Sequence, residues 1–407
     1  MAKHRRPPST ASRIGTGAVA AVAVAAVAAG MLALVNGFSN GSPVDASAAA
    51  ATGSARGSAS ATGAQPAASV SSSSATRLPA AVPLHVVSTS PDGSDSISGA
   101  APIVVTFDEP VTTNVLPQLQ PAIAGRWARP TPTTLQFSPE TAFVPDTKVT
   151  LTVPAGMRAE NGGLLATTTT VSYQVADGSL LRLQQLLAEL GYLPVNFVPA
   201  EPEDRSAAAQ AASAFNPPSG DFVPRFSSIP QALSALWRPG EVTAVTTGAI
   251  MAFENVHDLK VDGDAGPAVW SALLQDAINE VDDPQLYTWA LTTMNHPETL
   301  QIWSNGDFVF SSKANTGIPA APTPVGSWPV FMRYRSQTMQ GTNPDGSKYY
   351  DTGVPFVNYF HDGDAIHGFK RASYGSQQSL GCVELPYAAA SQVWDLIDYG
   401  TVVTVTR

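Results

Sequence analysis

The residues of this chain that are best suited to chemistry are one cysteine and one histidine near its end. Cys382 is the only cysteine among 407 residues, and His367 lies 15 positions before it. A thiolate is a strong nucleophile, and a neighbouring imidazole can take the proton from the thiol. With no second cysteine, Cys382 is either a reactive thiol or a small buried side chain. We interpret Cys382 as a nucleophile and His367 as its base.

Small residues surround this pair in the sequence. Gly381 directly precedes the cysteine, Ser379 lies two positions further back, and Gly368 follows the histidine. Glycine lets the backbone approach a substrate carbonyl closely, so N–H groups beside Cys382 can stabilise an oxyanion. We expect Gly381, Ser379 and Gly368 to form the loops that hold the reacting groups.

The elements that must position the pair are mostly strands. Residues 300–303 and 308–310 flank Asn305-Gly306, and Asn-Gly between apolar runs is a strong hairpin signal. Further strands are expected at 328–334, 356–360 and 401–406, and one helix at 387–399 with Pro386 at a favourable first-turn position. Residues 285–407 therefore predict a mostly β catalytic domain with one helix after the cysteine.

The segments Ile366-His367-Gly368 and Ser379-Leu380-Gly381-Cys382, with Thr323–Trp328 upstream, resemble the L,D-transpeptidase (YkuD) catalytic domain. The resemblance covers about residues 286–407. It implies a β-sandwich whose cysteine attacks a peptidoglycan tetrapeptide stem and releases D-Ala. The side-chain amine of a second stem then takes the acyl group, which gives a 3→3 cross-link. No metal or other cofactor is implied, because a thiol and an imidazole suffice for acyl transfer.

Two positions depart from the family pattern. Leu380 stands where the family usually has a histidine, which removes a second imidazole near the thiol. Glu384 stands where the family usually has Asn or Arg, which places a negative charge where a donor is common. Altered acceptor choice, weaker binding of an anionic stem and lost activity all stay open.

Nearby aromatic and acidic residues are candidates for secondary roles. Tyr359, Phe360 and Trp328 are candidates for lining the substrate groove, although core packing is the commoner role of each. Asp362 and Asp364 are expected to belong to a turn, and we assign no carboxylate to orient His367.

Residues 177–280 show helical periodicity. A stripe of leucines ends at Gly191, and it comprises Leu180, Leu183, Leu186, Leu187 and Leu190. Helical segments return at 247–253 and 269–274 on either side of a turn at 261–267. This order resembles a three-helix peptidoglycan-binding domain. The Pro- and Ala-rich stretch 194–240 is expected to be an inserted loop. Asp262 and Asp264 are expected to shape the turn, since the Glu that completes a calcium loop is missing.

Residues 80–176 predict a small β-sandwich. Short strand-like runs at 103–107, 134–137, 149–153 and 171–175 are separated by turn residues. The stretch loosely resembles bacterial immunoglobulin-like modules, and we expect it to be a spacer. The preceding residues 38–79 are rich in Ser, Ala, Gly and Thr and predict a flexible linker.

The N-terminus predicts export. Residues 1–13 form a basic head, and residues 14–37 carry no charge, long enough for a transmembrane helix or a signal sequence. Either reading places the later domains outside the cell, anchored to the membrane or secreted to the wall. The net charge of −10, with no basic stripe, argues against a nucleic-acid partner. The expected partners are peptidoglycan stem peptides and glycan, and the membrane through residues 14–37.

Three rival functions follow from the same residues. An L,D-carboxypeptidase would share the acyl-enzyme and use water as the acceptor. A sortase needs an arginine after its cysteine, and only Arg407 follows Cys382. A wall-binding scaffold with a decayed catalytic domain would fit the departures at Leu380 and Glu384, but the retained Cys382 and His367 favour an enzyme.

Overall fold

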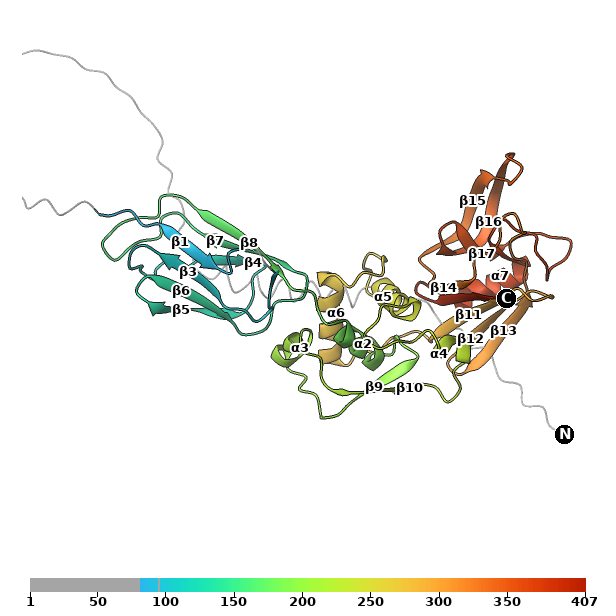
Figure 1. Cartoon of the computed structure of the whole chain (residues 1–407), viewed down its shortest axis with the longest axis horizontal. Helices are drawn as coiled ribbons and strands as arrows, with labels where there is room; N and C mark the ends of the chain where they lie inside the picture. Colours follow the sequence, from blue (N-terminus) through green and yellow to red (C-terminus); the bar gives the residue numbers. More distant parts are fainter. Residues whose placement is uncertain (1–80, 94–95) are drawn as a thin grey trace, which may run out of the picture. The chain divides into compact units, whose positions relative to one another are not determined.

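The computed structural model describes residues 81–93 and 96–407 (Figure 1). The expectations for residues 1–13, 14–37 and 38–79 lie outside the described residues. Within the described part of the chain, no helix is both long enough and apolar enough to cross a membrane.

Residues 81–176 form a β-sandwich, as predicted. One sheet has the strand order β1-β3-β6-β5 and the other has the order β2-β8-β7-β4. The strands are β1 (Val86–Ser90), β2 (Ser96–Ile97), β3 (Ile103–Phe107), β4 (Gln118–Gln120), β5 (Gly125–Thr131), β6 (Thr134–Pro139), β7 (Lys148–Val153) and β8 (Thr169–Val175). Buried side chains alternate along β3 and β7, which is the period of a strand with one face in the core.

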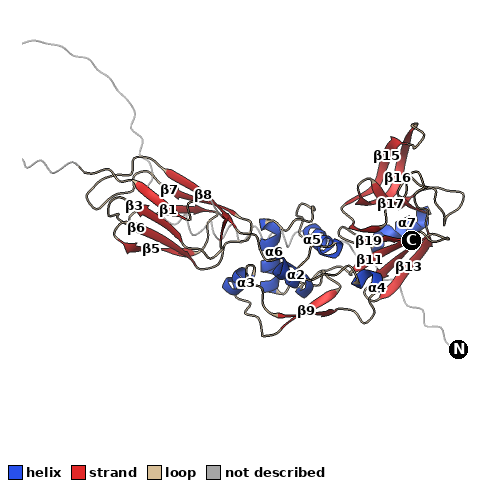
Figure 2. Cartoon of the chain, viewed as in Figure 1, coloured by secondary structure: helices blue, strands red, loops and turns tan. Residues whose placement is uncertain are grey.

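Three helices form where the leucine stripe and the later apolar segments predict them. They are α2 (Leu180–Glu189), α5 (Ala244–Val256) and α6 (Pro267–Asn279), shown in blue in Figure 2. The Ser179 side chain caps α2 by accepting a hydrogen bond from the N–H of Arg182. Gly191 follows the helix with a φ of 86°, a conformation that suits glycine.

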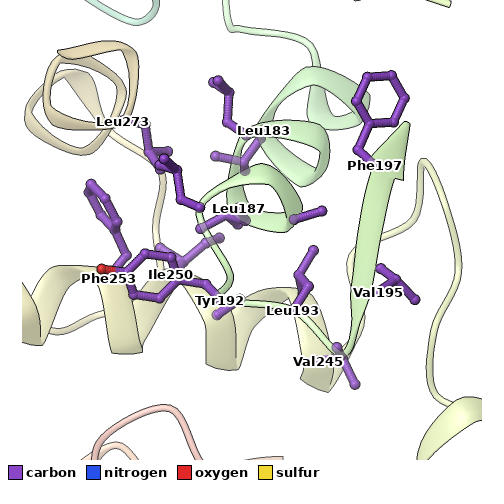
Figure 3. Close-up of a cluster of buried hydrophobic side chains, with 14 of the residues drawn as sticks. Leu183, Leu187, Tyr192, Leu193, Val195, Phe197, Val245, Ile250, Phe253 and Leu273 are labelled. Carbon is purple, nitrogen blue, oxygen red and sulfur yellow. The ribbon is translucent and has the colours of Figure 1, made fainter. Parts of the chain in front are cut away.

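The prediction that residues 194–240 are an inserted loop is wrong. The segment forms an antiparallel pair of strands and two short helices: β9 (Val195–Pro199), α3 (Ala207–Ser213), β10 (Gly220–Pro224) and α4 (Gln231–Ser234). Val195 and Phe197 join the buried cluster that includes Leu187 (Figure 3). The Pro and Ala content hides this alternation of buried and exposed side chains, which is typical of a half-buried strand.

Residues 285–407 contain two sheets and one helix. The five-stranded sheet has the order β13-β12-β11-β19-β14, and the four-stranded sheet has the order β15-β16-β17-β18. The elements are β11 (Thr288–Thr293), β12 (Thr299–Ser304), β13 (Asp307–Lys313), β14 (Gly326–Pro329), β15 (Met332–Thr342), β16 (Lys348–His361), β17 (Asp364–Gly368), β18 (Val383–Leu385), α7 (Tyr387–Leu396) and β19 (Val402–Thr406). Apolar residues of both sheets and α7 share one buried core.

The hairpin between β12 and β13 is confirmed, and Asn305 and Gly306 both have positive φ. The single strand expected at 328–334 is instead two strands, because Pro329 ends β14 and β15 begins at Met332 in the other sheet. The predicted helix 387–399 ends at Leu396, after which the backbone of Ile397 is extended. Pro386 lies at the cap before this helix, not in its first turn.

Candidate active site

Strands β17 and β18 bring His367 and Cys382 to one face of the four-stranded sheet. The two strands are parallel, with His367 opposite Glu384. Ile366 and Val383 point into the domain core, and Ala365 packs with Cys382 in a second cluster. Side chains alternate along a strand, so His367 lies on the face of Ala365 and Cys382. The loop of residues 369–381 thus brings the chain back, so that Cys382 lies beside β17, the strand that carries His367.

His367 is buried and held by its own strand. Its Nδ1 lies 3.1 Å from the carbonyl oxygen of Gly368. A carbonyl oxygen can only accept, so Nδ1 carries a hydrogen and Nε2 is the nitrogen free to take a proton. Burial lowers the pKa of His367, against the opposing effect of this hydrogen bond. At neutral pH the imidazole is therefore uncharged and able to act as a base.

The thiol of Cys382 is half-buried and protonated at rest. Burial raises its pKa to about 12, and the nearby carboxylates of Asp364 and Glu384 add to the rise. A hydrogen bond from the backbone of Ala365 works in the opposite direction with a smaller effect. A base would therefore have to take the proton from this thiol before it could act as a nucleophile, because the thiolate is the reactive form.

Ser379 and Gly381 shape the turn before the cysteine. The Ser379 hydroxyl donates to the carbonyl oxygen of Cys382 at 2.5 Å and accepts from the N–H of Gly381 at 3.3 Å. Gly381 has a φ of 119°, and a side chain there would overlap Oδ1 of Asp364. At Gly368, a side chain would press on Tyr387 and Pro355, so this glycine allows close packing against α7.

Glu384 is paired with an arginine that sequence reasoning missed. Its carboxylate is 4% exposed and accepts two hydrogen bonds from Arg371, each 2.7 Å long. Arg371 also donates to the carbonyl oxygen of Gln378 at 3.1 Å. The negative charge that the sequence places at Glu384 is therefore balanced by Arg371 within the same domain. The only sequence signal was two basic residues, Lys370 and Arg371, in the loop between the histidine and the cysteine.

His361 is a second residue that sequence reasoning missed. Its Nδ1 lies 3.3 Å from Oδ2 of Asp364, and its ring lies 4.5 Å from that of Trp328. Asp364 was expected in a turn but is the first residue of β17. Asp362 lies in the turn, as expected, with a φ of 42°. The sequence signal that could have revealed this pair is a histidine three positions before an aspartate, with a glycine between them.

The three aromatic candidates occupy different places. Tyr359 packs in the cluster that contains Cys382. Phe360, the next residue on β16, is buried in the domain core with Ile366 and Val383. Phe360 thus has the commoner role named for these aromatic residues, core packing, and does not line a groove, because adjacent strand residues face opposite sides. Trp328 is half-buried between that core and His361.

Comparisons with known proteins identify two parts of the chain. Residues 291–405 match the family model of the L,D-transpeptidase catalytic domain, and residues 80–175 match that of a bacterial Ig-like domain. No curated protein sequence matches the chain.

Several solved structures are similar to parts of it. An L,D-transpeptidase from Mycobacterium smegmatis is 13% identical, with 80% of this chain and 100% of that chain covered and a TM-score of 0.28. L,D-transpeptidase 3 from Mycobacterium tuberculosis is 14% identical, with 79% and 98% covered and a TM-score of 0.28. The catalytic domain of the E. faecium L,D-transpeptidase is 24% identical, with 29% and 95% covered and a TM-score of 0.27.

Proposed function

Since the chain carries an L,D-transpeptidase catalytic domain at residues 291–405, we propose that it is an exported enzyme that forms 3→3 cross-links in peptidoglycan. The observation that carries the proposal is the shared face of Cys382 and His367, with Nδ1 of the histidine held by the Gly368 carbonyl. This arrangement leaves Nε2 as the proton acceptor for a thiol that is protonated at rest.

The first half-reaction is acylation. His367 takes the thiol proton as the sulfur of Cys382 attacks the carbonyl carbon before the terminal D-Ala. The protonated imidazole then gives this proton to the leaving amine, and D-Ala departs from a thioester acyl-enzyme. Because burial lowers the pKa of His367, its imidazolium is a good acid for this step.

The second half-reaction is transfer. The side-chain amine of a second stem attacks the thioester carbon, the C–S bond breaks, and Cys382 is restored as a thiol. If water attacks in its place, the same acyl-enzyme gives a tripeptide, which is the carboxypeptidase reaction. The two outcomes differ only in which acceptor occupies the site when the thioester forms.

The remaining segments have proposed supporting roles. Residues 80–176 are a spacer, and the helical region 177–280, with its folded segment 194–240, binds the wall. Residues 14–37 anchor the chain in the membrane or direct its secretion, so that the catalytic domain meets the wall outside the cell. Glycan and stem peptides are the proposed partners.

Mass spectrometry of products tests this function. The full-length chain is incubated with purified disaccharide-tetrapeptide, beside the Cys382→Ala variant. A dimer lighter by one D-Ala, absent with the variant, is the expected result. Tripeptide without dimer would assign a carboxypeptidase, and untouched substrate would favour a wall-binding scaffold.

A further inference from the structure

We propose that Asp364 and His361 form the binding site for the acceptor amine, where the amine is held as a cation and loses its first proton. This inference rests on the proposed function and names the residues that select an amine over water. Neither residue has a role in the acylation step described above.

The turn between β16 and β17 wraps around the nucleophile. The carbonyl oxygen of Gly363 lies 4.0 Å from the sulfur of Cys382, and the backbone of Ala365 is hydrogen-bonded to it. Asp364 lies between these two residues, and its Oδ1 lies against Gly381, the neighbour of Cys382 on the other side. The Asp364 carboxylate is therefore close enough to Cys382 to act on the thiol electrostatically, and it raises the pKa of that thiol.

The Asp364 carboxylate is open to an incoming group. Its side chain is 19% exposed and that of His361 is 29% exposed. The hydrogen bond between them orients both side chains, and both remain accessible from solvent. Arg371, in the loop between His367 and Cys382, is already bound to Glu384. A carboxylate at this point attracts an ammonium group and repels the carboxylate of a departing D-Ala. The charge therefore fits the acceptor stem better than the leaving group.

The pair also has the right form for proton transfer. When Nδ1 of His361 donates to Asp364, its Nε2, which lies 3.8 Å from Oδ2 of Asp362, carries no hydrogen and can accept a proton. The bound ammonium gives one proton to Nε2, and the neutral amine attacks the thioester carbon. The C–N bond forms and the C–S bond breaks. His367 passes the second proton from the amine nitrogen to the departing sulfur, which leaves an amide and a thiol.

His361 would thus supply the second imidazole that the family resemblance leads one to expect at position 380. Leu380 cannot take or give a proton, whereas His361 contacts Asp364, whose Oδ1 lies against Gly381 beside Cys382. The departure in the motif is compensated from a different element.

Binding to an unreactive enzyme tests the site without requiring turnover. The full-length chain with Cys382→Ser is titrated by calorimetry with disaccharide-tripeptide, first with its side-chain amine free and then with that amine acetylated. We expect acetylation to weaken binding by about tenfold or more, since a charge-assisted hydrogen bond is lost. With Asp364→Asn added, acetylation should change the affinity by less than about twofold.

The control is Asp395→Asn, which removes the same charge from an exposed position on α7 in the same domain. In this variant, acetylation of the probe should weaken binding as much as it does in the parent, the Cys382→Ser chain. In the reactive enzyme, Asp364→Asn and His361→Gln should each lower the ratio of dimer to tripeptide among the products formed.

Equal affinity for the free and acetylated probes in the parent would overturn the inference, even if the wild-type chain makes dimer. An Asp364-dependent preference for the free amine would support it, even if no dimer forms and the proposed function fails. An equal loss of dimer and tripeptide in Asp364→Asn and His361→Gln would also contradict it. The two residues would then be needed for the reaction of the Cys382 thiol and not for binding of the acceptor amine.

Discussion

The guanidinium group of Arg371 donates two 2.7 Å hydrogen bonds to the carboxylate of Glu384, which stands directly opposite His367 in the β17–β18 ladder. The pair places one positive and one negative charge beside His367, the proposed catalytic base. Glu384 raises the pKa of His367 and Arg371 lowers it, so the two effects oppose each other. A carboxylate at this position is therefore compatible with an uncharged imidazole.

Replacing Arg371 with Gln should destabilise the fold. The variant leaves the Glu384 carboxylate buried without its charged partner, and breaking such a pair is costly. Because Arg371 is partly exposed, we expect a loss of about 2 kcal/mol in the free energy of unfolding, measured by urea denaturation. The double variant Arg371→Gln with Glu384→Gln should recover most of this loss. Equal stability of wild type and the single variant would show that the ion pair has little structural value.

The reactivity of Cys382 should depend on pH in an unusual way. Because its pKa is raised to about 12, the fraction of thiolate should be small at neutral pH and rise steadily through pH 10. The rate of iodoacetamide labelling should follow this rise, whereas the urea-unfolded chain should titrate near the ordinary value of about 8.5. A plateau of the folded protein's labelling rate below pH 8 would show that the thiol is stored as a thiolate.

Gly381→Ala should impair both folding and catalysis. The residue has a φ of 119°, and the added methyl group would overlap Asp364, so the turn before the nucleophile must shift. Gly346→Ala is the matched control, because Gly346 also has positive φ but an added side chain there contacts nothing within 4 Å. We expect about 1–3 kcal/mol more destabilisation at Gly381 than at Gly346 in thermal unfolding. Equal effects would mean that the contact with Asp364 is unimportant.

Phe360→Ala and Tyr359→Phe should separate packing from substrate contact. Phe360 lies in the core, and its truncation should cost about 3–5 kcal/mol of unfolding free energy. Tyr359 lies on the nucleophile's side, and loss of its hydroxyl should alter KM for the stem peptide with little change in stability. A large loss of stability in Tyr359→Phe, together with a changed KM and unchanged stability in Phe360→Ala, would contradict this assignment.

The sequence predicts the parts of this molecule that depend on local signals. Alternating apolar residues mark the strands of the sandwich, Asn305-Gly306 marks a hairpin, and the leucine stripe marks α2. His367 and Cys382 can be paired because each stands within a short, distinctive motif. The segment 194–240 was harder to predict, because its Pro and Ala content masks a strand pair that is stabilised by packing on distant helices.

The charged partners of the site depend on strand register, which short-range patterns do not reveal. Arg371 meets Glu384 only because the loop after β17 folds back along β18. His361 meets Asp364 only because the β16–β17 turn is tight enough to bring residues three positions apart into contact. These partners change how the departures at Leu380 and Glu384 are interpreted.

The most direct test of the central claim is mass spectrometry of the intact chain during reaction with disaccharide-tetrapeptide. We predict a transient mass increase equal to the donor minus D-Ala, located on the peptide that contains Cys382 and strongly reduced in His367→Ala. A covalent adduct on any other residue, or release of D-Ala by Cys382→Ala, would contradict the assignment of Cys382 as the nucleophile and His367 as its base.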